Sequence, residues 1–255
     1  RVFIKPHLNC GQCSYCLQNS PKNCLNLKSY GKEINGFLRD FAVVPVENLV
    51  LLPENITDND ANFINSIAIC INALNALQAS QGDYIVILGA DIIGTIMAQL
   101  AVFYHLVPIV IDDSEARLEN LKQFGITYLL NSYDRGIKKT IIDITGGKLA
   151  ECVIIPPFYD TELDATAFIS IGGKIAVVNL SMPYNINIQE ISSKQLSIFG
   201  ISNGLSSYKA AINMIVNKTV KTDFLIDEIA DFKNVPDIFE KMEKKPLTKQ
   251  TIIKI

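Results

Sequence analysis

The chain lacks the features that mark nucleic-acid-binding and membrane proteins. Its 255 residues carry 23 Lys and Arg against 26 Asp and Glu, a net charge of -3, with no basic cluster. Nucleic-acid-binding proteins present a positive patch to phosphates, so this balance predicts no such partner. No apolar run reaches the roughly 20 residues that span a bilayer, and no signal peptide opens the chain. We therefore expect a cytoplasmic protein with no membrane partner.

Histidine is also scarce, with two residues in the sequence, His7 and His105. We interpret each as a surface or capping residue and not as a metal ligand. The histidines therefore add no ligand to a catalytic zinc site, and we name no catalytic residue. Hydrophobic residues make up 49% of the chain and charged residues 19%. This composition predicts a globular protein with a sizeable core.

Cysteine, in contrast, is concentrated near the start of the chain. Four of the 6 cysteines follow the pattern C-x2-C-x2-C-x7-C, at Cys10, Cys13, Cys16 and Cys24. Four thiolates so close in sequence can surround one tetrahedral metal ion, and Zn²⁺ suits four sulfur ligands. Four protein ligands leave no open position for water or substrate. The predicted zinc is therefore structural.

Three alternatives compete with zinc at these cysteines. Two disulfides are possible, but nothing indicates secretion, and the other cysteines, Cys70 and Cys152, lie in apolar stretches typical of buried free thiols. An iron–sulfur cluster is the second alternative. The bacterial ferredoxin run has a shorter last gap and a proline after its fourth cysteine, whereas Leu25 follows Cys24 here. Free thiols clustered by chance are the third, and the spacing favours zinc over all of them.

Apolar strands alternate with helices through the middle of the chain. The predicted strands are Tyr84–Leu88, Pro108–Ile111, Tyr128–Leu130, Cys152–Ile155, Lys174–Val178 and Leu196–Gly200. Strands that are apolar throughout and separated by helices indicate a parallel sheet covered on both faces. We therefore predict an α/β fold with a doubly wound (Rossmann) sheet, which binds ligands at the carboxyl ends of its strands. Phe41–Pro45 is predicted as a further strand nearer the N-terminus.

The turn after the first of these strands resembles a dinucleotide-binding loop. It reads G-A-D-I-I-G over residues 89–94, where the fingerprint would be G-x-G-x-x-G. The middle glycine, which lets the backbone approach the pyrophosphate, is Asp91 here. Its carboxylate either points into solvent or caps the helix, and we expect NAD to bind with reduced affinity. The cofactor-binding candidates in this turn are Gly89, Ile92, Ile93 and Gly94.

Acidic residues stand at the end of the second predicted strand, at Asp112 and Asp113. A carboxylate there can accept both ribose hydroxyls of adenosine, and it repels a 2′-phosphate, so Asp112 favours NAD over NADP. Arg117 either stacks on adenine or meets a 2′-phosphate. The alternative reading is that Asp112, Asp113 and Ser114 only cap the next helix.

The cysteine loop, the Rossmann pattern and the segment after it resemble, in this order, the medium-chain, zinc-containing alcohol dehydrogenases. Residues 89–94, Asp112 with Arg117-Leu118, and Gly172-Gly173-Lys174 before the fifth strand carry the rest of the likeness. The resemblance covers nearly the whole chain. It implies part of a mainly-β catalytic domain with the zinc lobe over 1–68, a dinucleotide-binding domain over 69–205 and a return to the catalytic domain over 206–255.

This resemblance implies an NAD(P)-dependent oxidoreductase that transfers a hydride between an alcohol or carbonyl substrate and nicotinamide, working as a homodimer or homotetramer. In the family a catalytic zinc takes a cysteine and a His-Glu pair from a segment before the lobe, and we expect sequence upstream of Arg1. The later family ligand falls near Asn65, whose neutral amide is a poor ligand. Two alternatives stay open: a degenerate relative that binds a nucleotide or a partner protein without catalysis, and a zinc-free enone reductase, which the cysteine lobe argues against.

Overall fold

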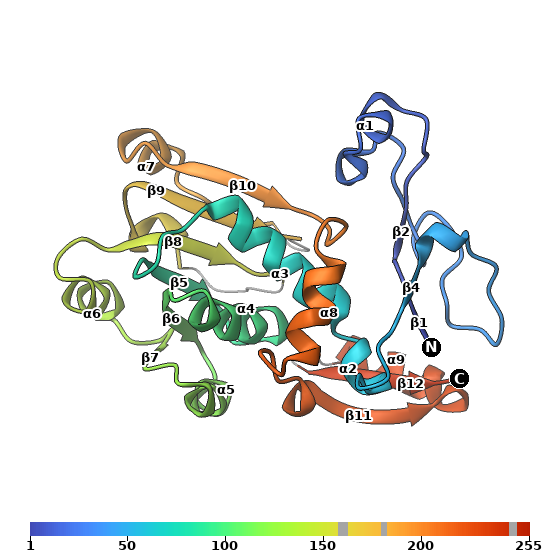
Figure 1. The fold of residues 1–255 in the computed structure, drawn as a ribbon. Helices are drawn as coiled ribbons and strands as arrows, with labels where there is room; N and C mark the ends of the chain where they lie inside the picture. The colour runs from blue at the N-terminus through green and yellow to red at the C-terminus, as the bar shows by residue number, and fades with distance from the viewer. Residues whose placement is uncertain (158–162, 180–182, 245–248) are drawn as a thin grey trace. The chain divides into compact units, whose positions relative to one another are not determined.

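The computed structural model describes residues 1–157, 163–179, 183–244 and 249–255 (Figure 1). Contacts between residues divide the chain into two compact units. Unit 1 comprises Arg1–Ala68 and Leu205–Ile255, and unit 2 comprises Ile69–Gly204. The first boundary falls inside helix α3 (Ile64–Leu77), so one continuous helix belongs to both units.

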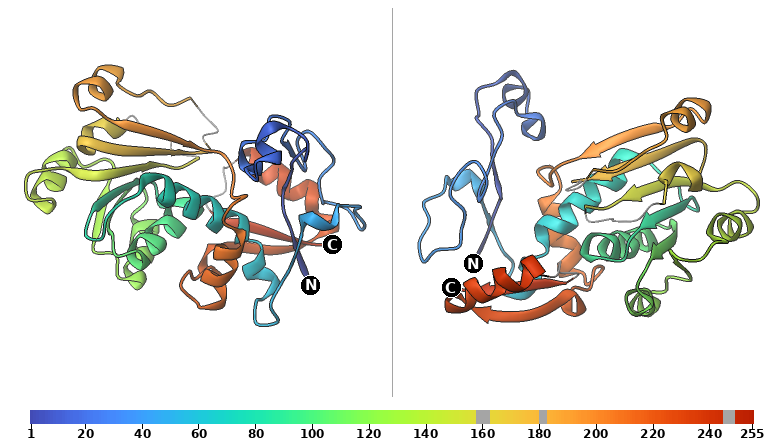
Figure 2. Two further views of the ribbon diagram at one scale, coloured as in Figure 1. Left: turned by 45° about the horizontal axis from the view of Figure 1, so that its top comes forward. Right: turned by 180° about the vertical axis from the view of Figure 1, so that it is seen from behind.

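Unit 2 is built on a 6-stranded parallel sheet (Figures 1 and 2). In spatial order its strands are β10 (Ser197–Ile201), β9 (Ile169–Val178), β8 (Ala150–Ile155), β5 (Tyr84–Leu88), β6 (Val107–Asp112) and β7 (Tyr128–Asn131). Every neighbouring pair is parallel. The strand order reverses between β5 and β8, and doubly wound sheets bind ligands beyond the strand ends at such a point. The predicted doubly wound parallel sheet is therefore confirmed.

The strands of this sheet are buried on both faces. Ile85, Val86, Ile87 and Leu88 of β5 are consecutive, and each is fully buried. Consecutive strand residues point to opposite faces, so both faces of the sheet are covered. One face carries a continuous apolar core with members from β5, β6, β8, β9 and the helix α6 (Ile137–Ile144). This double burial explains why the strands read as unbroken apolar runs in the sequence.

Helices connect the strands of unit 2. They are α4 (Ile92–Phe103), α5 (Glu115–Leu121), α6 and α7 (Ile188–Ser193). Helix α4 packs against β5 and β6, the two strands whose carboxyl ends carry the predicted cofactor residues. The hydroxyl of Ser114 accepts a hydrogen bond from the Arg117 N–H and so caps α5. Within the described residues, no helix has the length and apolarity needed to cross a membrane.

The described residues of unit 1 form three two-stranded sheets. They pair β1 (Val2–Ile4) with β4 (Leu49–Leu51), β2 (His7–Leu8) with β3 (Lys28–Ser29), and β11 (Ile226–Asp231) with β12 (Gln250–Lys254). Its other helices are α1 (Ser14–Leu17), α2 (Asp58–Ala61), α8 (Tyr208–Val216) and α9 (Val235–Lys244). The second sheet is the base of the cysteine lobe, because β2 leads into the lobe and β3 leads out of it.

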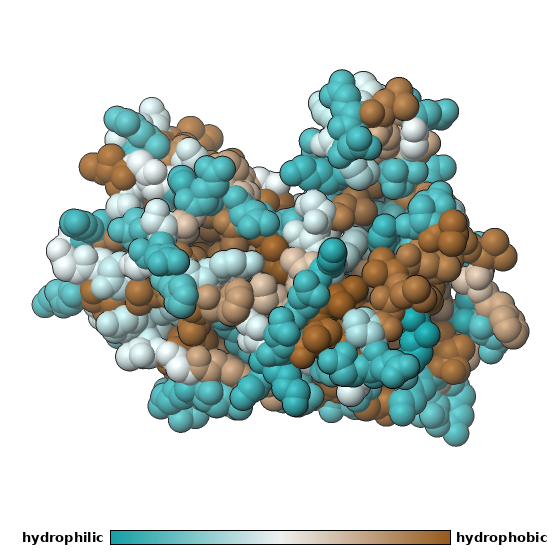
Figure 3. Space-filling view, in the orientation of Figure 1, coloured by the Kyte–Doolittle hydropathy of each residue, from teal (hydrophilic) through white to brown (hydrophobic). Residues whose placement is uncertain are grey.

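The predicted strand at Phe41–Pro45 is wrong. These residues form an irregular loop in which Phe41 is 90% exposed and Val43 101% exposed. The space-filling view shows brown, apolar surface along this loop of unit 1 (Figure 3). A strand needs a neighbouring backbone that satisfies its N–H and C=O groups, and no described strand pairs with residues 41–45.

Candidate functional site

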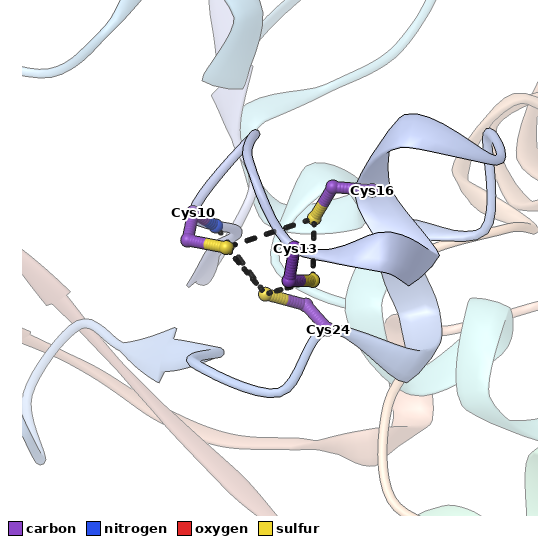
Figure 4. A group of neighbouring side chains, drawn as sticks. All are labelled: Cys10, Cys13, Cys16 and Cys24. Carbon is purple, nitrogen blue, oxygen red and sulfur yellow. Dashed lines mark hydrogen bonds between the residues drawn. The ribbon is translucent and has the colours of Figure 1, made fainter.

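The four cysteines of the N-terminal pattern converge on one point in unit 1 (Figure 4). Their Sγ atoms all lie within 4.8 Å of one another. The Sγ–Sγ distances are 3.5 Å for Cys13–Cys16 and Cys10–Cys24, 3.9 Å for Cys13–Cys24 and 4.0 Å for Cys10–Cys16. A tetrahedron with Zn–S bonds of about 2.3 Å has edges of about 3.8 Å. The four sulfurs therefore fit a single tetrahedral zinc ion.

Short local elements bring these sulfurs together. Cys13 is the N-cap of α1, and Cys16 lies on that helix. Cys24 follows a 3-10 turn that begins at Pro21, and its Sγ accepts a hydrogen bond from the Cys10 N–H at 3.3 Å. The backbone N–H groups of Gln12 and Cys13 lower the pKa of Cys10 to about 6. A lowered pKa favours the thiolate, which is the form of cysteine that binds zinc.

The same distances argue against the other readings of the cluster. A disulfide requires an S–S distance of about 2.05 Å, and all six cysteines are free thiols. In an iron–sulfur cluster the cysteines bind different iron atoms, which separates their sulfurs more widely than a single ion does. A chance group of thiols has no reason to adopt tetrahedral edges. The geometry favours one ion with four sulfur ligands.

The described residues do not fit a second, catalytic zinc ion. Among them, the cysteine cluster is the only group of three or more His, Cys, Asp or Glu side chains that converges in this way. The Asn65 side-chain oxygen accepts a hydrogen bond from the Tyr208 hydroxyl at 3.2 Å. Burial raises the pKa of Tyr208, so this donor stays protonated. His7 bonds to Ser29 at 3.1 Å, and His105 follows α4.

The turn between β5 and α4 requires glycine at both of its ends. Gly89 adopts a φ of 104°, in the region that side chains other than glycine rarely occupy. A Cβ added at Gly94 would lie 1.9 Å from the Gly89 carbonyl oxygen. Ile92 and Ile93 form the first turn of α4, where backbone N–H groups lack partners within the helix. Such a helix start is suited to bind a phosphate.

Asp91, at the middle position of the turn, caps α4. Its Oδ1 accepts a hydrogen bond from the Gly94 N–H at 2.8 Å. Of the two orientations expected from the sequence, the structure shows the cap and not the solvent-facing one. Burial raises the pKa of the Asp91 carboxyl, the Gly94 N–H opposes this rise and the charge of Asp112 adds to it. A carboxylate side chain therefore lies at the start of the helix, and its burial disfavours the ionised form.

Asp112 connects the end of β6 to this turn. Its Oδ2 accepts a hydrogen bond from the Ala90 N–H at 2.6 Å, and its Oδ1 accepts from the Ser114 N–H at 2.7 Å and from Arg117 Nε at 2.9 Å. The Asp112 side chain is only 4% exposed. Arg117 also pairs with Asp113 at 2.5 Å. The Ser114 hydroxyl caps α5, as the capping alternative expects, and the Asp112 carboxylate in addition joins the end of β6 to the Ala90 N–H of the turn.

Two contacts, one at the turn and one at the end of α3, were not anticipated from the sequence. The Thr95 hydroxyl, which is buried, donates to the Ala90 carbonyl at 3.2 Å and braces the turn from the helix. Lys174 of the Gly-Gly-Lys segment donates to the Leu77 carbonyl at 2.7 Å, at the end of α3. The sequence does not reveal this bond, because its acceptor is a main-chain carbonyl and a threonine inside an apolar helix has no characteristic pattern around it. Lys174 gives the last turn of α3 a hydrogen-bond donor for a carbonyl that has no partner within the helix, which is a structural role.

Comparison with known proteins agrees with this arrangement. The profile of the family described as "Zinc-binding dehydrogenase" matches residues 93–217, and that of the "Alcohol dehydrogenase GroES-like domain" matches residues 1–54. Together these two profiles cover most of the chain and include both the cysteine lobe and the strand-end acid Asp112.

Individual relatives point the same way. An uncharacterized zinc-type alcohol dehydrogenase-like protein of Haemophilus influenzae is 28% identical over 250 residues, which are 96% of this chain and 72% of the relative. The starvation-sensing protein RspB of Escherichia coli is 27% identical over 259 residues, 96% of this chain and 74% of the relative. A crystal structure of an Escherichia coli RspB alcohol dehydrogenase in complex with NADH matches with a TM-score of 0.85 at 25% identity, covering 100% of this chain and 77% of that one.

The cofactor state differs among the structures that share this fold. A zinc-binding dehydrogenase of Sinorhizobium meliloti in complex with NADP matches with a TM-score of 0.86 at 18% identity, covering 99% of this chain and 75% of that chain. The likeness alone therefore does not separate NAD from NADP. The two profiles, the relatives and the doubly wound sheet agree on one assignment: the chain belongs to the medium-chain, zinc-containing alcohol dehydrogenase family and is an NAD(P)-dependent oxidoreductase acting on a small molecule.

Proposed function

We propose that this oxidoreductase uses NAD(H), held by the turn over residues 89–94 and by Asp112, to interconvert an alcohol and its carbonyl product. The chemistry that a bound nicotinamide supplies is hydride transfer. The observation that carries the choice of NAD is the buried Asp112 carboxylate at the end of β6, beside the point where the strand order reverses. Oδ2 of Asp112 accepts one hydrogen bond, from Ala90, and retains a lone pair for a ribose hydroxyl.

The charges of the side chains around Asp112 also favour NAD over NADP. Arg117 lies between the carboxylates of Asp112 and Asp113, at 2.7 and 2.5 Å, so the three side chains carry one net negative charge. A 2′-phosphate arriving here would meet an arginine whose charge is already balanced by two carboxylates. The adenosine ribose of NAD brings neutral hydroxyls instead, which a carboxylate accepts.

We further propose that Cys10, Cys13, Cys16 and Cys24 hold one structural zinc ion. Four of the six sulfur–sulfur distances are 3.5 to 4.0 Å and all six are within 4.8 Å, which supports this proposal. Four sulfur ligands close the coordination sphere, so this ion stabilises the lobe and takes no part in hydride transfer.

The proposed function is tested by binding and by turnover. Titration with NADH, followed by the change in nicotinamide fluorescence, is expected to saturate, and NADPH is expected to bind more weakly. The protein is then incubated with NAD and a panel of primary, secondary and polyol alcohols, and NADH formation is measured at 340 nm. Absence of NADH binding would overturn the cofactor assignment. Binding without turnover of any alcohol in the panel would overturn the proposed reaction.

Replacing Asp112 by asparagine is expected to reduce the preference for NADH over NADPH by about tenfold, which corresponds to about 1.4 kcal/mol. The substitution removes a charge that repels a 2′-phosphate and releases Arg117 to meet it. The measurement is the ratio of the two dissociation constants. Asp113→Asn is the matched control, because Asp113 also pairs with Arg117 but does not bond to Ala90. Equal effects of both substitutions would contradict the role given to Asp112.

One observation favours a second candidate function, a relative that binds a nucleotide without catalysis. Asn65 offers a neutral amide oxygen that is engaged with Tyr208, at the position where the resemblance implies a zinc ligand. Zinc content, measured by mass spectrometry of the purified chain, separates the two functions when combined with the alcohol panel. One zinc per chain, NADH binding and no turnover would favour the second candidate. The cytoplasmic location and the homodimer or homotetramer stay predictions.

A further inference from the structure

The carboxylate of Asp91 stands where this fold binds a pyrophosphate. The start of α4 offers backbone N–H groups and the positive end of the helix dipole, which together bind anions. In this chain the Gly94 N–H is already donated to Asp91 Oδ1 at 2.8 Å. The Ile93 N–H also favours the charged form of this carboxylate. Asp91 therefore acts as an internal anion in the place of the external one.

The Asp91 carboxylate lies directly at the helix start. Its Oδ1 is 2.8 Å from the Gly94 backbone nitrogen and would be 3.5 Å from a Cβ added at Gly94. A pyrophosphate that approaches these N–H groups meets a like charge at short range. Protonation removes that charge, and it gives Asp91 an O–H that can donate to a phosphate oxygen.

We propose that Asp91 couples cofactor binding to the uptake of one proton from solvent, so that the dinucleotide binds more tightly as the pH falls. This inference rests on the proposed function and deepens it by naming the residue that controls cofactor affinity. The protein takes up the proton at a carboxylate oxygen of Asp91, and no covalent bond of the cofactor changes.

Three groups near Asp91 decide how readily it takes up this proton. Asp112, at the end of β6, adds negative charge and favours protonation, whereas Arg117 of α5 opposes it. Cys70 of α3 donates to the Ile93 carbonyl at 3.7 Å and is fully buried. Burial raises the pKa of the Cys70 thiol, so it stays neutral and contributes no charge. Burial likewise raises the pKa of Asp91 before any cofactor arrives.

The direction of the pH effect follows from comparing the pKa of Asp91 in the cofactor complex with its pKa in the free protein. The pyrophosphate is anionic, so the pKa of Asp91 is higher in the complex than in the free protein. The complex then binds more protons than the separate partners at any pH between those two pKa values. Cofactor affinity is therefore expected to rise by up to about tenfold for each unit by which the pH falls within this window. Below both pKa values the affinity becomes independent of pH.

The experiment is isothermal titration calorimetry of the full chain with ADP-ribose, which carries the pyrophosphate, lacks the nicotinamide and tolerates acid. Titrations at several pH values between about 5 and 8 are repeated in two buffers of different ionisation enthalpy. The difference in heat between the buffers gives the number of protons taken up. We expect an uptake that approaches one proton and an affinity that rises toward acid pH.

Asp91→Asn is the matched variant, because asparagine caps helices as well as aspartate does and cannot titrate. It is expected to bind ADP-ribose without this proton uptake and with little dependence on pH. At pH 8 it is expected to bind about tenfold more tightly than the unmodified chain, since a like charge has been removed. Adenosine, which has no phosphate, is expected to bind to both proteins without linked proton uptake.

The outcomes separate the inference from the function on which it rests. ADP-ribose binding without proton uptake, or an equal pH dependence in Asp91→Asn, would overturn the inference and leave the proposed function standing. Failure of ADP-ribose to bind to either protein at every pH would overturn the proposed function and the inference with it. Circular dichroism and a thermal melt of Asp91→Asn confirm that the variant is folded in either case.

Discussion

The variant Cys10→Ser is expected to lose its bound zinc and to unfold the lobe over residues 9–30 while the sheet of unit 2 stays folded. Within this segment Cys24 is the only buried residue. The helix α1 has four residues and buries none of them. Apolar burial therefore contributes little to the lobe, and isolated helices of this length are unstable in water. The metal ligands carry its stability.

The size of this effect follows from the free energy of zinc binding. Structural zinc sites bind their ion with an apparent free energy of about 10–16 kcal/mol, most of which is available only when the surrounding chain is folded. A serine hydroxyl at position 10 is a far weaker ligand than a thiolate and leaves three sulfurs. We expect the variant to contain less than about half the zinc of the unmodified chain after dialysis against a chelator.

Limited trypsin digestion locates the unfolding. Lys22 and Lys28 lie in the lobe, and cleavage after them is expected to become about tenfold faster or more, because local opening controls proteolysis. Cys152→Ala is the matched control, since it removes a buried cysteine of unit 2 that lies outside the cluster. Its zinc content is expected to equal that of the unmodified chain. If Cys10→Ser kept its zinc and its resistance to trypsin, the metal site would be wrong.

The second large effect is expected for Gly94→Ala. The new Cβ would lie 1.9 Å from the Gly89 carbonyl oxygen and 2.9 Å from its carbonyl carbon. These are backbone atoms, which cannot move away as a flexible side chain does. The helix α4 must shift off the strand end, and we expect unit 2 to lose about 3 kcal/mol of stability or more. Binding of NADH is expected to weaken by well over about tenfold, since the helix start no longer meets the pyrophosphate.

Gly200→Ala provides the control for this change. Gly200 lies in β10 of the same unit, and a Cβ added there meets no atom within 4 Å. Its stability is expected to stay within about 0.5 kcal/mol of the unmodified chain. Thermal melts compare the two variants with the unmodified chain, and NADH titration compares the same three proteins at a temperature at which all three are folded. Equal melting temperatures for both variants would contradict the close approach of α4 to Gly89.

The doubly wound sheet was predictable because its strands are buried on both faces. Burial of consecutive residues requires consecutive apolar residues, and this pattern stands out between helices. The strand predicted at Leu196–Gly200 is β10 at Ser197–Ile201, a shift of one residue at each end. The cluster of four cysteines was predictable for a related reason, since its members come from 15 consecutive residues, Cys10 to Cys24, and local geometry is enough to gather them.

The same reasoning failed at Phe41–Pro45, where an apolar run of strand-forming residues is an exposed loop. Strand propensity reflects packing on a paired, half-buried surface, so it carries no weight where no neighbouring strand is present. At Asp91 the sequence predicted the position of the residue but not the orientation of its side chain. Its position in the turn is readable from the sequence, but two orientations of its carboxylate were open until the Gly94 N–H was placed.

What the linear chain contains, then, is every feature that depends on spacing along it: the four-cysteine pattern, the alternation of strands and helices, and the glycines of the turn over residues 89–94. The tertiary structure alone decided how distant groups meet. It brought Asp112 within 2.6 Å of the Ala90 N–H, engaged Asn65 with Tyr208 across 143 positions of sequence, and set the Asp91 carboxylate at the start of α4. Hydrogen bonds and charges act over a few ångströms of space, and separation along the chain does not report that distance.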